Sequence, residues 1–101
     1  MSREAEDARN GLAVAVVLIS AIKECAKCRA CEAMMGRIMR DCPGQIGFTK
    51  VRADAPEAAD YGVVMPPMLI IDGFIACAGR VPIESGVRKL IARKLAEGGS
   101  A

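Results

Sequence analysis

The alternation of apolar and polar positions divides the chain into strand-like and helix-like segments. Residues 12 to 19 read LAVAVVLI, a short apolar run without polar alternation, which predicts a strand buried on both faces of a sheet. Residues 46 to 53 contain β-branched and aromatic side chains and predict a second strand. Residues 67 to 72 predict a third strand, and the hairpin signal Asp72-Gly73 predicts that residues 74 to 78 return antiparallel to it.

Helical periodicity occupies the segments between and after these strands. A first helix is predicted to follow the loop of residues 20 to 24 and to end at Pro43-Gly44. Its apolar positions recur at three- and four-residue steps and are Cys28, Cys31, Met35, Ile38 and Cys42. Asp54 and Pro56 can start a short helix that extends to about Tyr61. 

A final helix is predicted after Pro82, with Gly98-Gly99 as its stop. One face of this helix is expected to carry Ile83, Val87, Leu90, Ile91 and Leu95. The resulting order is β-α-β-α-β-β-α, in which right-handed crossovers make the first two strands parallel and place the hairpin alongside. We therefore expect a three-layer α/β domain with a four-stranded mixed sheet.

The chain length allows one hydrophobic core, because 101 residues correspond to one small domain. Residues 12 to 97 are expected to form this domain, between a loose polar tail of residues 1 to 11 and a short C-terminal tail of residues 98 to 101. The apolar run of residues 12 to 19 is far shorter than the ~20 residues that a membrane span needs. No membrane association is therefore expected.

Composition and charge exclude several classes of function. The net charge is only +2 and aromatic residues make up 3 %, so neither a phosphate-binding surface nor stacking platforms for nucleic acid are expected. The absence of histidine excludes Cys-His and Ser-His catalysis, zinc sites that contain histidine, and haem ligation by histidine. The chemistry must therefore come from other side chains.

The five cysteines are the candidate chemical groups. An odd number cannot be consumed by intramolecular disulfides alone, so at least one thiol is free or exchanging. The first eleven residues carry Glu4, Glu6 and Asp7 where a signal peptide carries positive charge. We therefore expect a cytoplasmic protein, in which clustered cysteines are more often catalytic or metal-binding than structural.

Cys25-Ala26-Lys27-Cys28 lies where the loop after the first strand becomes a helix. The spacing brings two thiols close enough to form a small disulfide ring and points the first sulfur at the unpaired N–H groups of the helix start, which stabilise a thiolate. Residues 23 to 40 carry a net charge of +3, and Lys27 lies within the motif itself. This pattern predicts a dithiol oxidoreductase with Cys25 as nucleophile and Cys28 as resolving thiol, needing no metal or cofactor.

Other roles for the cysteines stay open at this point. Cys31 lies on the same helical stripe as Cys28, so it is either core packing, a backup resolving thiol or a third ligand. A soft metal or metalloid ion bound by Cys25, Cys28 and Cys31 is the alternative function. Cys42 and Cys77 are expected to be packing residues.

Two further interpretations are weaker. The C-x2-C-x2-C run is an unsuitable iron–sulfur motif, because ten residues separate Cys31 from Cys42 where the bacterial ferredoxin run has three. An interaction domain without turnover could use the exposed hairpin and Pro66 as a docking edge. Retention of both Cys25 and Cys28 is evidence against that interpretation.

Three stretches carry a resemblance to a known family: residues 25 to 28, residues 61 to 73, which read YGVVMPPMLIIDG, and residues 78 to 82, which read AGRVP. The sequence resembles the thioredoxin superfamily, and more closely the small thioredoxin-like group called redox-active disulfide protein 2. The resemblance implies a thioredoxin-like fold over about residues 12 to 96. It also implies the roles given above for Cys25 and Cys28, with Pro67 as the counterpart of the cis-proline that faces the disulfide.

By the same resemblance, Pro66 and Met65 belong to the segment that contacts the substrate. The implied partners are a disulfide-containing protein or small thiol and a thioredoxin-reductase-like electron donor. The sequence departs from ordinary thioredoxins at Pro66, which has no backbone N–H to offer a substrate strand. It also has Glu24 where those proteins have an aromatic residue before the motif, and no acid within residues 12 to 19.

Overall fold

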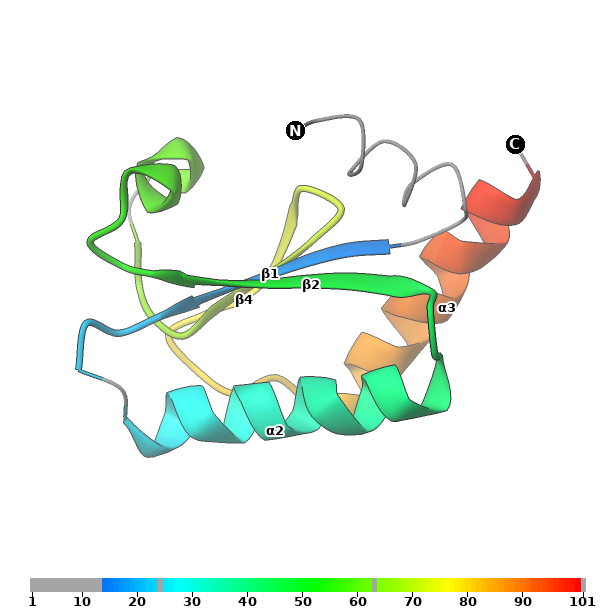
Figure 1. Cartoon of the computed structure of the whole chain (residues 1–101), viewed down its shortest axis with the longest axis horizontal. Helices are drawn as coiled ribbons and strands as arrows, with labels where there is room; N and C mark the ends of the chain where they lie inside the picture. The colour runs from blue at the N-terminus through cyan, green and yellow to red at the C-terminus, as the bar shows by residue number, and fades with distance from the viewer. Residues whose placement is uncertain (1–13, 24, 63, 101) are drawn as a thin grey trace.

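The computed structural model describes residues 14–23, 25–62 and 64–100. Its elements follow one another along the chain as shown in Figure 1. They are β1 (Val14–Ser20), α2 (Ala26–Asp41), β2 (Ile46–Arg52), the 3-10 helix η1 (Pro56–Tyr61), β3 (Met68–Ile71), β4 (Phe74–Ala78) and α3 (Glu84–Ser100). The predicted order of strands and helices is therefore confirmed.

The four strands form one mixed sheet in the order β2-β1-β3-β4. β1 pairs with β2 in parallel and with β3 antiparallel, and the β3–β4 pair is also antiparallel. β1, which is apolar from Val14 to Ile19, thus lies between two strands, while β2 and β4 are the edges. Because parallel neighbours need a crossover connection, α2 carries the chain from the end of β1 back to the start of β2.

The sheet separates two apolar layers. α2 and α3 lie on one face of the sheet and η1 lies on the other (Figure 1). The larger cluster contains Val14, Val16, Leu18, Cys31, Met34, Met35, Ile38, Leu69, Ile71, Cys77, Val87 and Ile91. The smaller cluster contains Ile19, Ala58, Met68 and Ile70. Burial on both faces explains why β1 and β3 show no polar alternation.

Sulfur is frequent in this interior. Among the described residues, six buried core side chains carry it: Cys28, Cys31, Met34, Met35, Met68 and Cys77. Flexible thioether chains and small thiols fill much of this interior, and the aromatic side chains of Phe48 and Tyr61 pack against it only partly buried. Cys42, also predicted to pack, is half-buried at the end of α2, where its N–H reaches the Ile38 carbonyl at 3.1 Å.

An ion-pair network ties the start of α3 to the end of α2. Glu84 accepts hydrogen bonds from Arg37 at 2.8 Å and from Arg88 at 2.9 Å, and Arg88 also reaches Asp41 at 2.7 Å. Single pairs at the surface contribute little to stability. Here three pairs share two residues, so together they orient α3 against α2.

Several local predictions are corrected by the structure. The short helix predicted to reach about Tyr61 is present, as a 3-10 helix over residues 56 to 61, since a short segment that begins with proline has few residues for α-helical bonds. Ile83 precedes α3 and is 78 % exposed, so its predicted place on the buried helix face is wrong. α3 continues to Ser100, so the predicted stop at Gly98-Gly99 and a tail from residue 98 are also wrong. Glycine weakens a helix by about 1 kcal/mol but retains the N–H that proline lacks.

Strand ends also differ slightly from the prediction. β1 extends to Ser20, one residue beyond the predicted end, while β3 begins only at Met68, because Pro67 has no N–H for the ladder. The tail predicted for residues 1 to 11 lies outside the described residues. Within the described part of the chain, no helix is both long and apolar enough to cross a membrane.

The β3–β4 turn is tied to the central strand. Asp72 and Gly73 have φ of 50° and 82°, the left-handed conformation that a two-residue hairpin of this type requires. The Asp72 carboxylate accepts the Ala15 N–H at 2.9 Å, and the Asp72 N–H donates to the Ala15 carbonyl at 2.7 Å. One residue thus sets both the turn and its attachment to β1.

We predict that Asp72→Ala destabilises the fold by about 1 to 2 kcal/mol, because alanine disfavours positive φ and removes the acceptor for Ala15. Asp72→Asn is the matched control, since asparagine tolerates this conformation and keeps a side-chain oxygen. Urea unfolding followed by circular dichroism measures both free energies of unfolding. Equal stability of the alanine and asparagine variants would contradict the assigned role.

Candidate dithiol site

Cys25 is the N-cap residue of α2. Its backbone is extended, with φ −117° and ψ 177°, and its carbonyl accepts the Arg29 N–H at 3.1 Å, so the helix begins immediately after it. The first N–H groups of a helix have no partner within the helix and carry partial positive charge. Because Cys25 is exposed, its sulfur lies where this helix start meets solvent.

Cys28, one turn into the helix, is the buried partner of this thiol. The two Sγ atoms lie 3.6 Å apart, and both cysteines are in the thiol form. The Cys28 side chain is completely buried and its Sγ accepts the backbone N–H of Ala21 at 3.4 Å. One thiol of the pair therefore faces solvent while the other is enclosed.

The helix start favours ionisation of Cys25. The backbone N–H of Cys28 contributes most to lowering the pKa of the Cys25 thiol, followed by the Cys28 side chain. The backbone N–H of Lys27 and then its positive charge add smaller effects in the same direction, while desolvation opposes them. Stabilisation of the thiolate by a helix start and a neighbouring cation is the usual origin of a reactive cysteine.

Cys31 has the opposite environment. Its side chain is fully buried in the cluster between the sheet, α2 and α3. Burial, then charge repulsion from Cys77, Cys28 and Cys25, raises the pKa of the Cys31 thiol to about 11. At neutral pH Cys31 is therefore a protonated, poorly nucleophilic packing group.

Helix geometry also separates Cys31 from the pair. Cys28 and Cys31 both lie within α2, where positions three apart have Cβ atoms about 5 to 6 Å apart. A disulfide needs Cβ atoms about 3.5 to 4.5 Å apart, so a Cys28–Cys31 bond requires the helix to distort. Cys25 lies in the extended N-cap and is not held to helical spacing.

The alternative metal-binding function finds little support in this arrangement. Across the described residues, no three Cys, Asp or Glu side chains lie together in a way that could hold an ion. Cys25, Cys28 and Cys31 therefore do not assemble as a common ligand set in this structure.

The segment before β3 lies at the same end of the sheet as the dithiol. Met68 pairs with Ile19, so Pro67 lies next to the end of β1, from which the chain leads to Cys25 (Figure 1). The Pro66–Pro67 peptide bond is cis, as the resemblance implies. Pro67 is buried and Pro66 is half-buried.

Residues around this segment supply an apolar surface. Met65 is 53 % exposed, and its N–H donates to the Met68 sulfur at 3.2 Å. Ile22, in the loop before the dithiol, is 62 % exposed. The structure thus places Met65, Pro66 and Pro67 at the end of the sheet from which the chain leads to Cys25, whereas Cys31 lies in the core cluster. Lys27 and Met65 are exposed, while Pro67 is buried.

Two features of the site were not found from the sequence. One is the Ala21 N–H on the Cys28 sulfur, a backbone contact that no residue type signals. The other is a hollow of about 290 Å³ beside it, lined by Ser20, Ala21, Ile22, Lys50 and Arg52. Lys50 and Arg52 are ion-paired with Glu32 at 3.0 Å and Asp54 at 2.7 Å, so sequence charge alone overstates the free positive charge there.

A family profile described as a thioredoxin domain matches residues 14–92, which include the dithiol and the cis-proline segment. The chain belongs to the thioredoxin domain family. Membership gives this thioredoxin domain a redox-type role, because thioredoxin-like proteins act on disulfide substrates. No curated protein matches the sequence significantly.

Among solved structures, the thioredoxin domain is similar to thioredoxin-2 of a malaria parasite, reported as a component of that parasite's protein secretion machinery. The two share 21 % sequence identity with a TM-score of 0.65, over 80 % of this chain and 82 % of that one. At this identity the likeness shows the fold alone. It agrees with the β-α-β-α-β-β-α order described above.

We predict that iodoacetamide modifies Cys25 of the reduced thioredoxin domain well before the other cysteines. Its rate should rise with pH and reach half of its maximum below pH 9, the ordinary thiol pKa, because only the thiolate reacts and its pKa is lowered. Lys27→Gln should slow the reaction below the plateau by about twofold, since an exposed cation has a modest effect. Mass mapping of alkylated peptides measures the rates, and preferential labelling of Cys28 would contradict the assignment.

A second prediction concerns alkaline stability. The Cys31 thiol has its ordinary pKa of 9.0 in the unfolded chain and a pKa of about 11 in the folded domain. Above pH 9 the unfolded chain ionises first, so the stabilising contribution of this buried thiol is complete below pH 9 and is lost as the pH rises through 11. Cys31→Ala should therefore have a lower free energy of unfolding than the natural domain at neutral pH. The difference between the two proteins should narrow between pH 9 and pH 11. Urea unfolding at several pH values measures it, and a constant difference would contradict this account.

Proposed function

We propose that this thioredoxin domain is a thiol-disulfide oxidoreductase in which Cys25 attacks and Cys28 resolves. The observation that carries the proposal is the pair itself: an exposed sulfur at a helix start lies 3.6 Å from an enclosed one. The lowered pKa of Cys25 raises the fraction of this thiol that is ionised at a given pH. A disulfide-containing protein or small thiol can reach only the exposed member of the pair.

The exchange proceeds in two substitutions at sulfur. The Cys25 thiolate attacks one sulfur of the substrate disulfide, forming a mixed disulfide and releasing the other substrate sulfur as a thiolate. Cys28 then loses its proton and attacks the Cys25 sulfur, which releases the second substrate thiolate. The Cys25–Cys28 disulfide remains, and the substrate has gained two electrons. Return to the dithiol requires two electrons from an external dithiol donor, for which we propose a thioredoxin-reductase-like protein.

The surroundings of Cys28 fit the second step. The Ala21 N–H that donates to its sulfur stabilises a developing thiolate without exposing it to solvent. The short distance to Cys25 means that attack needs little movement. Attack by Cys28 can therefore compete with cleavage of the mixed disulfide by other thiols.

Met65, Pro66 and Pro67 are proposed to contact the substrate next to Cys25. Pro66 can accept a hydrogen bond through its carbonyl but cannot donate one, so a substrate backbone would be held by one hydrogen bond fewer than at a residue with an N–H. The exposed side chains of Met65 and Ile22 offer apolar contact in compensation. We also propose a reducing compartment, the cytoplasm, as the site of action.

The test is a redox titration of metal-free protein against a dithiothreitol couple, with thiol alkylation and mass mapping of the bonded pair. We expect one reversible two-electron step located at Cys25–Cys28. Cys25→Ser should abolish reduction of a model disulfide such as insulin. Cys28→Ser should accumulate the mixed disulfide through Cys25, because resolution is lost.

Cys31→Ser serves as the matched control, because it changes a third thiol of the same helix. Its exchange activity should remain within about twofold of the natural domain, once compared at a temperature where both are folded. Equal loss of activity in Cys31→Ser and Cys28→Ser would refute the assigned roles. Failure to form any Cys25–Cys28 disulfide, with retention of metal by the reduced thiols, would replace the oxidoreductase with the binding function.

A further inference from the structure

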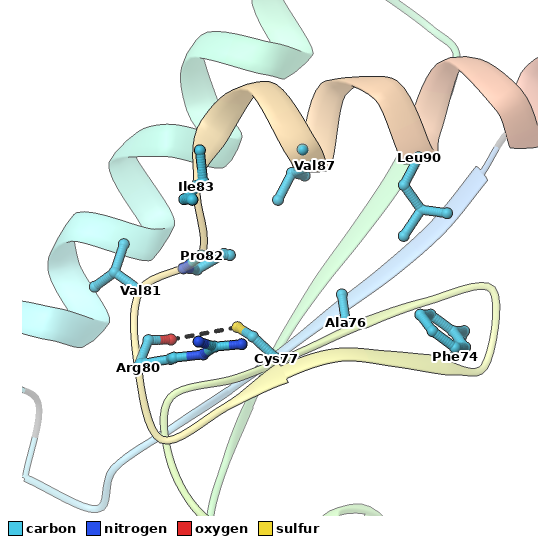
Figure 2. A pocket seen from close by; sticks show the side chains of 10 residues that line it. Phe74, Ala76, Cys77, Arg80, Val81, Pro82, Ile83, Val87 and Leu90 are labelled. Carbon is cyan, nitrogen blue, oxygen red and sulfur yellow. Dashed lines mark hydrogen bonds between the residues drawn. The ribbon is translucent and has the colours of Figure 1, made fainter.

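A groove with no part in the proposed chemistry lies between β4 and the start of α3 (Figure 2). It has a volume of about 240 Å³. Its lining is mostly apolar and comprises Phe74, Ala76, Cys77, Arg80, Val81, Pro82, Ile83, Gly86, Val87 and Leu90. In Figure 2, β4 forms the lower wall, α3 the upper wall, and the segment from Arg80 to Pro82 closes one end.

The rim of the groove is unusually apolar for a surface. Ile83 is 78 % exposed and Phe74 is 57 % exposed, while Val87 and Cys77 behind them are buried. Large exposed side chains over a buried apolar floor are typical of a surface that binds another molecule. The volume is below the range of about 300 to 1,000 Å³ of small-molecule sites, so it fits the anchoring side chains of a larger partner.

Exposed cations lie at and near the groove. Arg80 lines it, and Lys89 and Arg93 lie exposed on α3 on either side of Leu90 along the chain. None of these three cations is ion-paired with a residue that the structure describes. Glu84, at the start of α3, is already bonded to Arg37 and Arg88. The rim therefore complements negative charge.

We propose that the β4–α3 groove docks an apolar, acidic segment of a protein partner, with apolar side chains in the groove and carboxylates on the basic rim. A second copy of this chain fits less well, because the same cations would face one another across the contact. A flat anionic membrane also fits less well, because the groove is concave and its floor is recessed. An apolar segment flanked by acids satisfies both the shape and the charge.

The groove adjoins the dithiol end of the molecule through one short segment. The Gly79 N–H donates to the Pro67 carbonyl at 2.9 Å, and a Cβ atom added at Gly79 would lie 3.9 Å from the Met65 Cβ. Arg80, the next residue, already lines the groove. A partner docked there would extend toward Cys25, and this link, unlike the docking itself, rests on the proposed function.

The docking is tested on the full chain with Cys25→Ser and Cys28→Ser, so that no disulfide exchange can capture a ligand. A library of random peptides displayed on phage is selected against this protein, and the enriched peptide is synthesised and titrated by fluorescence anisotropy. We expect enriched sequences with several Asp or Glu beside aliphatic or aromatic residues. Arg80→Glu and Ile83→Ser should each weaken binding by about tenfold or more.

Matched controls change the same residue types elsewhere. Lys23→Glu alters an exposed cation in the loop before the dithiol, and Ile75→Ser alters an exposed isoleucine of β4 that does not line the groove. Both should leave binding within about twofold. Circular dichroism melts establish that all four variants are folded. Since both groove side chains are exposed, their substitution is expected to leave the fold intact.

Four outcomes would overturn the docking site: no acidic and apolar enrichment, binding lost with Ile75→Ser but not with Ile83→Ser, binding to phosphatidylserine vesicles in place of peptide, or a dimer that Ile83→Ser dissociates. The redox titration is run separately on the natural dithiol. Peptide binding without a Cys25–Cys28 disulfide would reject the proposed function and retain the groove. A normal titration without peptide binding would reject the groove alone.

Discussion

The chemistry of this protein depends on one contact, between the Cys25 sulfur and the backbone at the start of α2. The N–H groups there lower the thiol pKa more than the nearby lysine charge does. Their position depends in turn on where β1 ends, because the short loop after Ser20 sets the start of the helix. The buried central strand thus determines the reactivity of an exposed atom.

Differences in burial give the thiols at the start of α2 different roles. Cys25, Cys28 and Cys31 follow one another at equal spacing along the chain, yet the first is exposed and the other two are buried. Cys25 and Cys28 each have a neighbouring sulfur and a backbone donor, while Cys31 is surrounded by the apolar core. Equal sequence spacing therefore does not mean equal chemistry.

Much of the architecture could be predicted from apolar patterning, since a strand buried on both faces and an amphipathic helix leave distinct patterns. The dithiol could also be predicted, because the Cys25–Cys28 spacing and its place after a strand are local features. The 3-10 form of η1, the length of α3 and the exposure of Ile83 could not, since each depends on tertiary contacts near the end of an element. The Ala21 contact and the β4–α3 groove likewise arise only when distant segments meet.

The sulfur-rich interior has a consequence for the durability of the molecule. Buried Met34, Met35 and Met68 are stable toward peroxide only while the core stays closed, because oxidation to the sulfoxide makes an apolar side chain polar. A transient opening of α2 would expose two of them together, and their oxidation would oppose reclosure. This interior therefore makes the lifetime of the protein under oxidative stress depend on how seldom that helix opens.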